Sequence, residues 1–190
     1  MPSLRDRLPP GQYMAKDLPV HLAGSIPLWN PETWDFRVFG LVESPLTLSH
    51  AEFEAIPRVE RISDLHDVST WSVLDNRWEG VPAREIVARV RPLPQAAFVL
   101  LHADGGASAS LPLSDLLRVD VLLATRRGGV VLPPEQGAPL RIVVPHRYAF
   151  KSLRWLRAIE VLDREQKGFF EARGYSASAD PWKDDRFAES

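Results

Sequence analysis

Residues 34–42 read Trp-Asp-Phe-Arg-Val-Phe-Gly-Leu-Val, and this stretch gives the first indication of the fold class. Apolar and polar side chains alternate along it up to Gly40, which is the pattern of a strand with one buried face. Short apolar-rich runs predict four more strands, at residues 58–62, 97–102, 140–144 and 156–162. The domain is therefore predicted to consist mainly of strands.

Helices are predicted to be few and short. Each begins at a residue type that suits a helix N-terminus, either a serine cap or a proline in the first turn. The predicted helices are residues 48–56 with Ser49 as the cap, 82–90 with Pro82 at the start, and 113–117 with Ser114 as the cap.

The order of these elements favours one fold class over another. Two pairs of glycines, Gly105-Gly106 and Gly128-Gly129, fit no phosphate-binding or dinucleotide-binding motif and predict hairpin turns. Strands and helices do not alternate strictly, so a wound βαβ fold is not expected. The sequence predicts an α+β fold, with a strand-rich mixed sheet and short helices.

Composition excludes several classes of function. The chain has 190 residues, 23 Lys+Arg against 25 Asp+Glu, and no cysteine. A net charge of −2 with interspersed signs argues against a nucleic-acid partner, and no run approaches the ~20 apolar residues of a membrane span. Residues 1–7 have no apolar signal core, so a cytoplasmic protein is expected. Without thiols, disulfides, iron–sulfur clusters and cysteine nucleophiles are excluded.

Proline content divides the chain into two parts. Residues 1–33 are rich in proline, which disfavours helix, and are predicted to form an extended arm packed on a domain of residues 34–190. Apolar side chains in the arm offer anchors on that domain: Tyr13, Val20, Leu22, Ile26 and Trp29.

Two clusters of polar and aromatic residues are candidates for a functional site. Residues 64–81 contain acids, a histidine, hydroxyls and two tryptophans, which suggests a polar loop with aromatic walls at a small-molecule pocket. Residues 145–155 carry four Lys, Arg or His side chains between aromatic residues. On a chain of slightly negative net charge, this cluster indicates either one anionic ligand or a solvated basic face.

The chain resembles the sulfite oxidase family, the oxidoreductase molybdopterin-binding domain, and in particular its small bacterial single-domain members. Four blocks in the same order carry this resemblance: residues 34–45, 64–81, 137–156 and 168–182. It implies a mixed α+β domain that binds a molybdenum–molybdopterin cofactor. It also implies a small-molecule substrate and, because no haem domain is present, a separate electron-transfer protein.

The resemblance also assigns residues to the site. At the matching positions Arg141, Lys151, Ser152 and Arg154 would bind the phosphate of the pterin, as cationic and hydroxyl donors suit a buried phosphate. His66, Trp71 and Ser72 would line the same cavity. Gln136 stands where larger relatives have a histidine, and it can donate a hydrogen bond but carries no charge.

Asp67 departs most strongly from the family pattern, because it stands where the family has its metal-ligating cysteine. One interpretation makes Asp67 the protein's metal ligand and catalytic residue, through a carboxylate oxygen instead of a soft thiolate. A second interpretation is a degenerate site that binds cofactor without turnover, as a molybdopterin-binding or scaffold protein. An engineered exchange of Cys for Asp would give the same sequence.

A second departure concerns the substrate. Sulfite-oxidising relatives have a tyrosine after the Asp-Gly motif and arginines after the metal ligand. Here Ala107 and Ala109 occupy the first stretch, and residues 69–72 read Ser-Thr-Trp-Ser in the second. The sequence therefore predicts a substrate other than sulfite.

Overall fold

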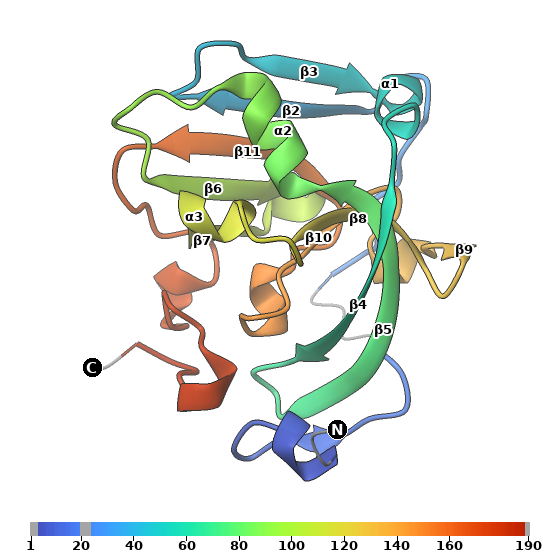
Figure 1. Cartoon of the computed structure of the whole chain (residues 1–190), viewed down its shortest axis with the longest axis vertical. Coiled ribbons are helices and arrows are strands. Elements are labelled where there is room, and N and C mark those ends of the chain that lie inside the picture. The colour runs from blue at the N-terminus through green and yellow to red at the C-terminus, as the bar shows by residue number, and fades with distance from the viewer. Residues whose placement is uncertain (1–3, 20–23, 189–190) are drawn as a thin grey trace.

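The computed structural model describes residues 4–19 and 24–188, and within them the strands form two sheets (Figure 1). The first sheet has five strands in the order β3-β2-β11-β6-β7. Its centre is β11, which pairs in parallel with β2 and antiparallel with β6. The strands are β2 (Asp35–Gly40), β3 (Leu46–Ser49), β6 (Phe98–Ala103), β7 (Ser108–Pro112) and β11 (Leu156–Leu162).

The second sheet has six strands and is organised around β5 (Trp71–Pro82), a 12-residue strand. Figure 1 shows the hairpin of β4 and β5 extending away from the five-stranded sheet. Gly80 of β5 crosses β8 so closely that an added Cβ would lie 2.2 Å from the carbonyl oxygen of Leu123, so only glycine fits. The other strands are β1 (Tyr13–Met14), β4 (Val59–His66), β8 (Leu122–Arg127), β9 (Val130–Val131) and β10 (Arg141–Val143).

Three short α-helices connect the strands in the described chain: α1 (His50–Glu54), α2 (Ala83–Val90) and α3 (Leu113–Leu116). In α1, Ser49 and Glu52 form a reciprocal capping box, as the Ser49 prediction required. The predicted cap at Ser114 is wrong, because the N-cap of α3 is Pro112 and Ser114 lies inside the helix. Single turns of 3-10 helix occur at η1 (Leu4–Arg7), η2 (Asp104–Gly106), η3 (Pro134–Gln136), η4 (Ala149–Lys151), η5 (Glu171–Arg173) and η6 (Pro181–Lys183).

The largest hydrophobic core lies between the inner face of the five-stranded sheet and the helices (Figure 1). Phe36 and Val38 of β2 belong to it, as do Ile86 and Val90 of α2. A second core lies under the six-stranded sheet around Trp78, which is fully buried. This arrangement confirms the predicted α+β class, the five predicted strands and both glycine hairpins.

Residues 64–81 were predicted to form a polar loop, and this prediction is wrong. They form the end of β4, a turn at residues 67–70 and all of β5. From Asp75 to Trp78 the side chains alternate between exposed and buried, and the buried ones are Asn76 and Trp78. Pairing on both sides of β5 therefore overrides the polar composition, since this strand needs few apolar side chains on its outer face.

The described part of residues 1–33 contacts the rest of the chain. Arg7 forms ion pairs with Asp64 and Asp75, at 2.6 and 2.7 Å. Leu18 is buried in the second core, whereas the side chain of Tyr13, an expected anchor, is mostly exposed. Trp29 packs against the first core and Ile26 is half-buried, while Val20 and Leu22 lie outside the described residues. No helix within the described ranges is long and apolar enough to cross a membrane.

Candidate cofactor site

A cavity of about 490 Å³ lies where residues from the six-stranded sheet meet the C-terminal segment. Its polar end is formed by Arg141 of β10 and Arg154, and its other walls are largely aromatic. Six predicted site residues line this cavity: Asp67, Trp71, Gln136, Arg141, Ser152 and Arg154. His66, Ser72 and Lys151 are not among its lining residues.

Asp67 begins the turn that joins β4 to β5, here called the Asp67 turn (residues 67–70). Its amide donates to the carbonyl oxygen of Trp71 at 2.8 Å, which closes the turn. Its Oδ1 accepts hydrogen bonds from the amide and the hydroxyl of Ser69, at 2.9 and 2.5 Å. Its Oδ2 accepts no hydrogen bond from the described residues, so one carboxylate oxygen remains available at the cavity.

Arg141 carries the clearest electrostatic signal in the site. Its side chain is buried and donates to the carbonyl oxygens of Gln136 and Ser152, both at 3.1 Å. Its Nε has no hydrogen-bond partner, and no carboxylate in the described ranges forms an ion pair with it. Burial, together with the nearby charges of Arg154 and Arg127, lowers the pKa of Arg141 to about 9. A buried guanidinium without a carboxylate partner among the described residues favours an anionic ligand.

Arg154 and Ser152 extend this anion-binding end of the cavity. Arg154 donates to the carbonyl oxygen of Glu135 at 2.9 Å and stacks over Trp155, 4.7 Å from the ring centre. Burial lowers the pKa of Arg154, while the negative charge of Asp67 opposes that shift. The Ser152 hydroxyl accepts from the amide of Val144 at 2.8 Å, so its own proton can be donated. Arg141 and Arg154 are the only cations among the described lining residues.

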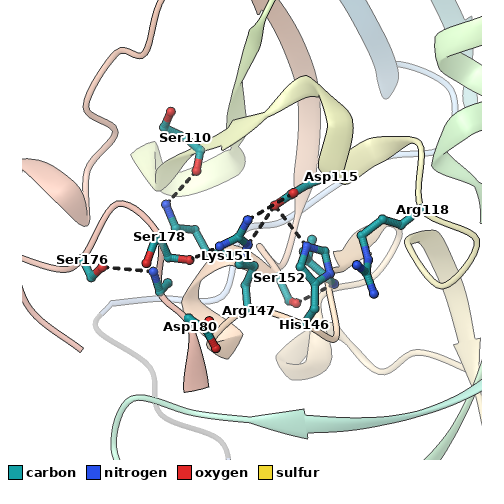
Figure 2. Close-up of polar contacts among 12 residues, drawn as sticks. Ser110, Asp115, Arg118, His146, Arg147, Lys151, Ser152, Ser176, Ser178 and Asp180 are labelled. Carbon is teal, nitrogen blue, oxygen red and sulfur yellow. Dashed lines mark hydrogen bonds and ion pairs between the residues drawn. The ribbon is translucent and has the colours of Figure 1, made fainter. Parts of the chain in front are cut away.

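The basic cluster at residues 145–155 is divided between the cavity and the protein interior. Figure 2 shows the contacts of its members His146, Arg147 and Lys151. Arg147 makes a two-point ion pair with Asp115 of α3, at 2.8 and 3.2 Å, and His146 lies 3.1 Å from the same carboxylate. Lys151 is fully buried, donates to the carbonyl oxygen of Ser110 at 2.7 Å and pairs with Glu171 at 2.5 Å. Only Arg154 of this cluster reaches the cavity as a cation.

His66 and Ser72 form a buried network beneath the Asp67 turn. His66 Nδ1 lies 2.7 Å from the hydroxyl of Ser72, which donates to Gln12 at 3.2 Å. Burial lowers the pKa of His66, against the charge of Asp64, so the neutral imidazole is favoured. Both side chains therefore support the turn instead of lining the cavity.

The aromatic wall of the cavity was missed by sequence reasoning. Phe150, Phe170 and Tyr175 line it, with ring centres 5.1 to 5.6 Å apart. Phe170 and Tyr175 come from the C-terminal segment, whose aromatic residues are visible in the sequence but carry no signal of what they face. Their placement depends on the contact of η5 with β7, which the tertiary fold alone supplies.

These residues fit the phosphate-bearing heterocycle of a molybdenum cofactor better than its metal. The buried Arg141, its orphaned Nε and the flat aromatic wall suit a planar heterocycle that carries a phosphate. For the metal the chain offers one carboxylate and no thiol, and no group of three potential metal ligands occurs in the described ranges. A metal would therefore be held mainly by the cofactor's own sulfur ligands, with Asp67 as the protein's contribution.

The fold and the site define a class: an α+β domain whose cavity, with the buried guanidinium of Arg141 at one end, suits an anionic, phosphate-bearing cofactor. The model of the oxidoreductase molybdopterin-binding domain matches residues 23–170. The chain belongs to this family, the sulfite oxidase family, and is a molybdopterin-binding oxidoreductase domain.

Two curated relatives and one solved structure are similar to this chain. The uncharacterized oxidoreductase YuiH of Bacillus subtilis is 42% identical over 182 residues, 95% of this chain and 92% of that protein. The catalytic subunit MsrP of the protein-methionine-sulfoxide reductase of Ralstonia nicotianae is 34% identical over 79% of this chain, which spans only 49% of that protein. The sulfane dehydrogenase SoxCD of Paracoccus pantotrophus shares the fold, with a TM-score of 0.70 at 19% identity over 78% of this chain and 42% of that one.

Proposed function

We propose that the cavity binds a molybdenum–molybdopterin cofactor and that the protein is an oxidoreductase for a small molecule other than sulfite. The observation that carries this proposal is Arg141, a buried guanidinium at the cavity with no carboxylate partner in the described chain. The cofactor phosphate would supply the missing negative charge. We further propose that this happens in the cytoplasm.

The residues of the cavity have distinct roles in this proposal. Arg141, Arg154 and Ser152 bind the phosphate, Gln136 adds an uncharged contact, and Trp71 forms part of the wall. His66, Ser72 and Lys151 act one step away from the cofactor, by holding the Asp67 turn and η4 in place. The division into an arm of residues 1–33 and a domain of residues 34–190 remains part of the proposal.

A bound cofactor would supply two-electron oxidation and reduction at its metal. The chain's own contribution is Asp67, whose Oδ2 is available as the metal ligand while Ser69 holds Oδ1. The wall of Phe150, Phe170 and Tyr175 excludes water from the cofactor. Because both cationic residues among the described lining are assigned to the phosphate, the described part of the cavity offers no further cation for a sulfite dianion, and this supports a different substrate. Electrons would pass to a separate electron-transfer protein.

A second candidate is a molybdopterin-binding or scaffold protein without turnover. The observation that favours it is the state of Asp67, whose carboxylate already interacts with Ser69 and with the charge of Arg154. A hard carboxylate oxygen is also a poor substitute for a soft thiolate at this position. In this candidate the cofactor binds through its phosphate and the metal contact is lost.

The test is the molybdenum and pterin content of the full chain, purified from a host that makes the cofactor. Metal is quantified by mass spectrometry and pterin by fluorescence after oxidation, with Arg141→Ala as the binding variant and the exposed Arg164→Ala as its control. Near-stoichiometric molybdenum and pterin in the wild type, lost in Arg141→Ala alone, supports the oxidoreductase and justifies a substrate screen. Pterin without molybdenum supports the second candidate, and neither in the wild type removes both.

A further inference from the structure

The Asp67 turn is held from outside by both ends of the chain. The carbonyl oxygen of Asp67 accepts from Gln12 Nε2 at 3.0 Å, and the carbonyl oxygen of Thr70 accepts from the amide of Tyr13 at 2.9 Å. The carbonyl oxygen of Val68 accepts from Arg186 Nη1 at 2.5 Å. Three carbonyls of one four-residue turn are thus bound by residues from segments more than 50 positions away.

Gln12 is held in place by the pairing of the neighbouring strand β1 and by Ser72, in addition to its bond to the turn. Strand β1 pairs in parallel with β5, so that Tyr13 lies opposite Trp71 and Met14 opposite Ser72. The side-chain oxygen of Gln12 accepts from Ser72, whose hydroxyl also contacts His66. The amide of Gln12 is therefore oriented by a buried network, and its nitrogen donates to the carbonyl oxygen of Asp67.

Arg186 is equally restricted on the other side. Its Nε donates to Asp184 at 2.7 Å and its guanidinium lies 5.1 Å from the ring centre of Tyr148. Only 15% of its side chain is exposed. The backbone of this segment is anchored as well, because Ser176 donates to the carbonyl oxygen of Arg186 at 3.0 Å.

The two ends also touch each other over the turn. Arg186 Nη2 donates to the carbonyl oxygen of Pro10 at 3.4 Å, and an added Cβ on Gly11 would lie 3.3 Å from the same nitrogen. Figure 1 shows both terminal segments beside the free end of the β4–β5 hairpin. The turn needs such support because Thr70 has a positive φ of 82°, which a β-branched residue adopts only under constraint.

We propose that Gln12 and Arg186 are positioning residues that hold the Asp67 turn against the cavity, so that Asp67 faces it only when both chain ends are docked. This role rests on the proposed function in one respect, since it is Asp67 that would meet the metal. Neither residue touches the cofactor cavity itself. Their effect passes through the backbone carbonyls of the turn.

The first experiment is amide hydrogen exchange on the cofactor-free full chain, read at residues 67–71. Gln12→Met keeps the length of the side chain and removes its donor, and Arg186→Ala removes the second support. Each is expected to raise local exchange about fivefold, the factor for one net hydrogen bond, without a change in global unfolding. Arg186→Lys, which keeps a cationic donor, is expected to restore most of the protection.

Two exposed residues provide matched controls. Lys16→Ala in the arm and Arg164→Ala before the C-terminal segment are expected to leave exchange at residues 67–71 unchanged. If Gln12→Met unfolds the chain, Gln12→Glu keeps the acceptor for Ser72 and replaces the donor to Asp67 with a carboxylate oxygen. Wild-type exchange at the turn in the folded Gln12 and Arg186 variants overturns the positioning role.

Molybdenum content separates this inference from the proposed function. Loaded Gln12→Met and Arg186→Ala proteins are expected to lose molybdenum severalfold faster than the wild type on dialysis while they keep pterin. A wild type without molybdenum, combined with raised exchange in the variants, removes the proposed function and supports the positioning of the turn. A wild type that holds molybdenum, combined with unchanged exchange in the variants, supports the proposed function and removes the positioning of the turn by Gln12 and Arg186.

Discussion

Two groups of buried or partly buried cations lie in this molecule and have opposite electrostatic environments. Lys151 and Arg147 each contact a buried acid from another element, Glu171 and Asp115 respectively. Arg141 is as deeply buried, yet no carboxylate in the described ranges pairs with it. A cation that is paired with an acid of the protein stabilises the fold, whereas a buried cation without an acidic partner favours the binding of an anion at that place.

The largest effect on stability is expected when the buried ion pair of Lys151 and Glu171 is broken. Glu171→Ala leaves Lys151 buried and unpaired, and is expected to lower the free energy of unfolding by about 3–5 kcal/mol. Replacing both partners, Lys151→Met with Glu171→Leu, is expected to recover most of that loss because no buried charge remains. Urea denaturation measures both, with the exposed Asp163→Ala as control. A loss below ~1 kcal/mol for Glu171→Ala contradicts a structural role for this pair.

The second ion pair gives a smaller effect that depends on pH. Burial raises the pKa of Asp115, but the hydrogen bonds and charge of Arg147 and the adjacent His146, 3.1 Å from the carboxylate, together outweigh burial and lower the pKa below its usual range. The stabilisation from its carboxylate is thus complete above the unfolded pKa and is lost as pH falls through the lower folded value.

Asp115→Asn is accordingly expected to destabilise the chain by about 2–3 kcal/mol at pH 7, since Arg147 loses its charged partner. The difference from wild type should stay constant down to the unfolded pKa of 3.8 and shrink below it. Denaturation series at neutral, mildly acidic and strongly acidic pH check this window. A difference that shrinks already between pH 7 and the unfolded pKa assigns the stabilisation to another group.

Arg141→Met tests the buried cation that has no carboxylate partner in the described ranges. Removing an uncompensated buried charge offsets the loss of two hydrogen bonds, so the cofactor-free protein is expected to change in stability by only about 1 kcal/mol. Binding should respond much more strongly. Millimolar inorganic phosphate is expected to raise the melting temperature of the wild type and to leave that of Arg141→Met unchanged, measured by scanning calorimetry. An equal phosphate effect in both proteins would place the anion elsewhere.

Asp67→Cys is expected to have the smallest effect on stability, within about 1 kcal/mol, because the residue lies in a half-exposed turn. It supplies the thiolate that the rest of the chain lacks. Metal retention, measured as molybdenum per pterin, is expected to rise above the wild type, whereas Asp67→Ser, which adds no soft ligand, should not raise it. Equal ratios in all three proteins indicate that the metal does not meet residue 67.

Local patterns in the sequence predicted the strands whose apolar and polar residues alternate, and β11 was predicted with its observed bounds. Strand β5 was missed because Asp75, Asn76 and Arg77 give its middle a polar composition, and because two of its pairing partners, β1 and β8, are distant in sequence. Six site residues identified by the family resemblance line the cavity. The placement of Lys151 could not be predicted, since Glu171 lies 20 positions away and meets it only through the tertiary fold.

The origin of the aromatic wall has a consequence for limited proteolysis. Phe170 and Tyr175 lie after β11, the last strand of the described chain, while Arg141 and Arg154 precede its end. Residues 163–167 between β11 and the wall are exposed, which is where a protease cuts most readily. A cut there would leave every strand of both sheets and both cavity cations in one fragment and the wall residues Phe170 and Tyr175 in the other.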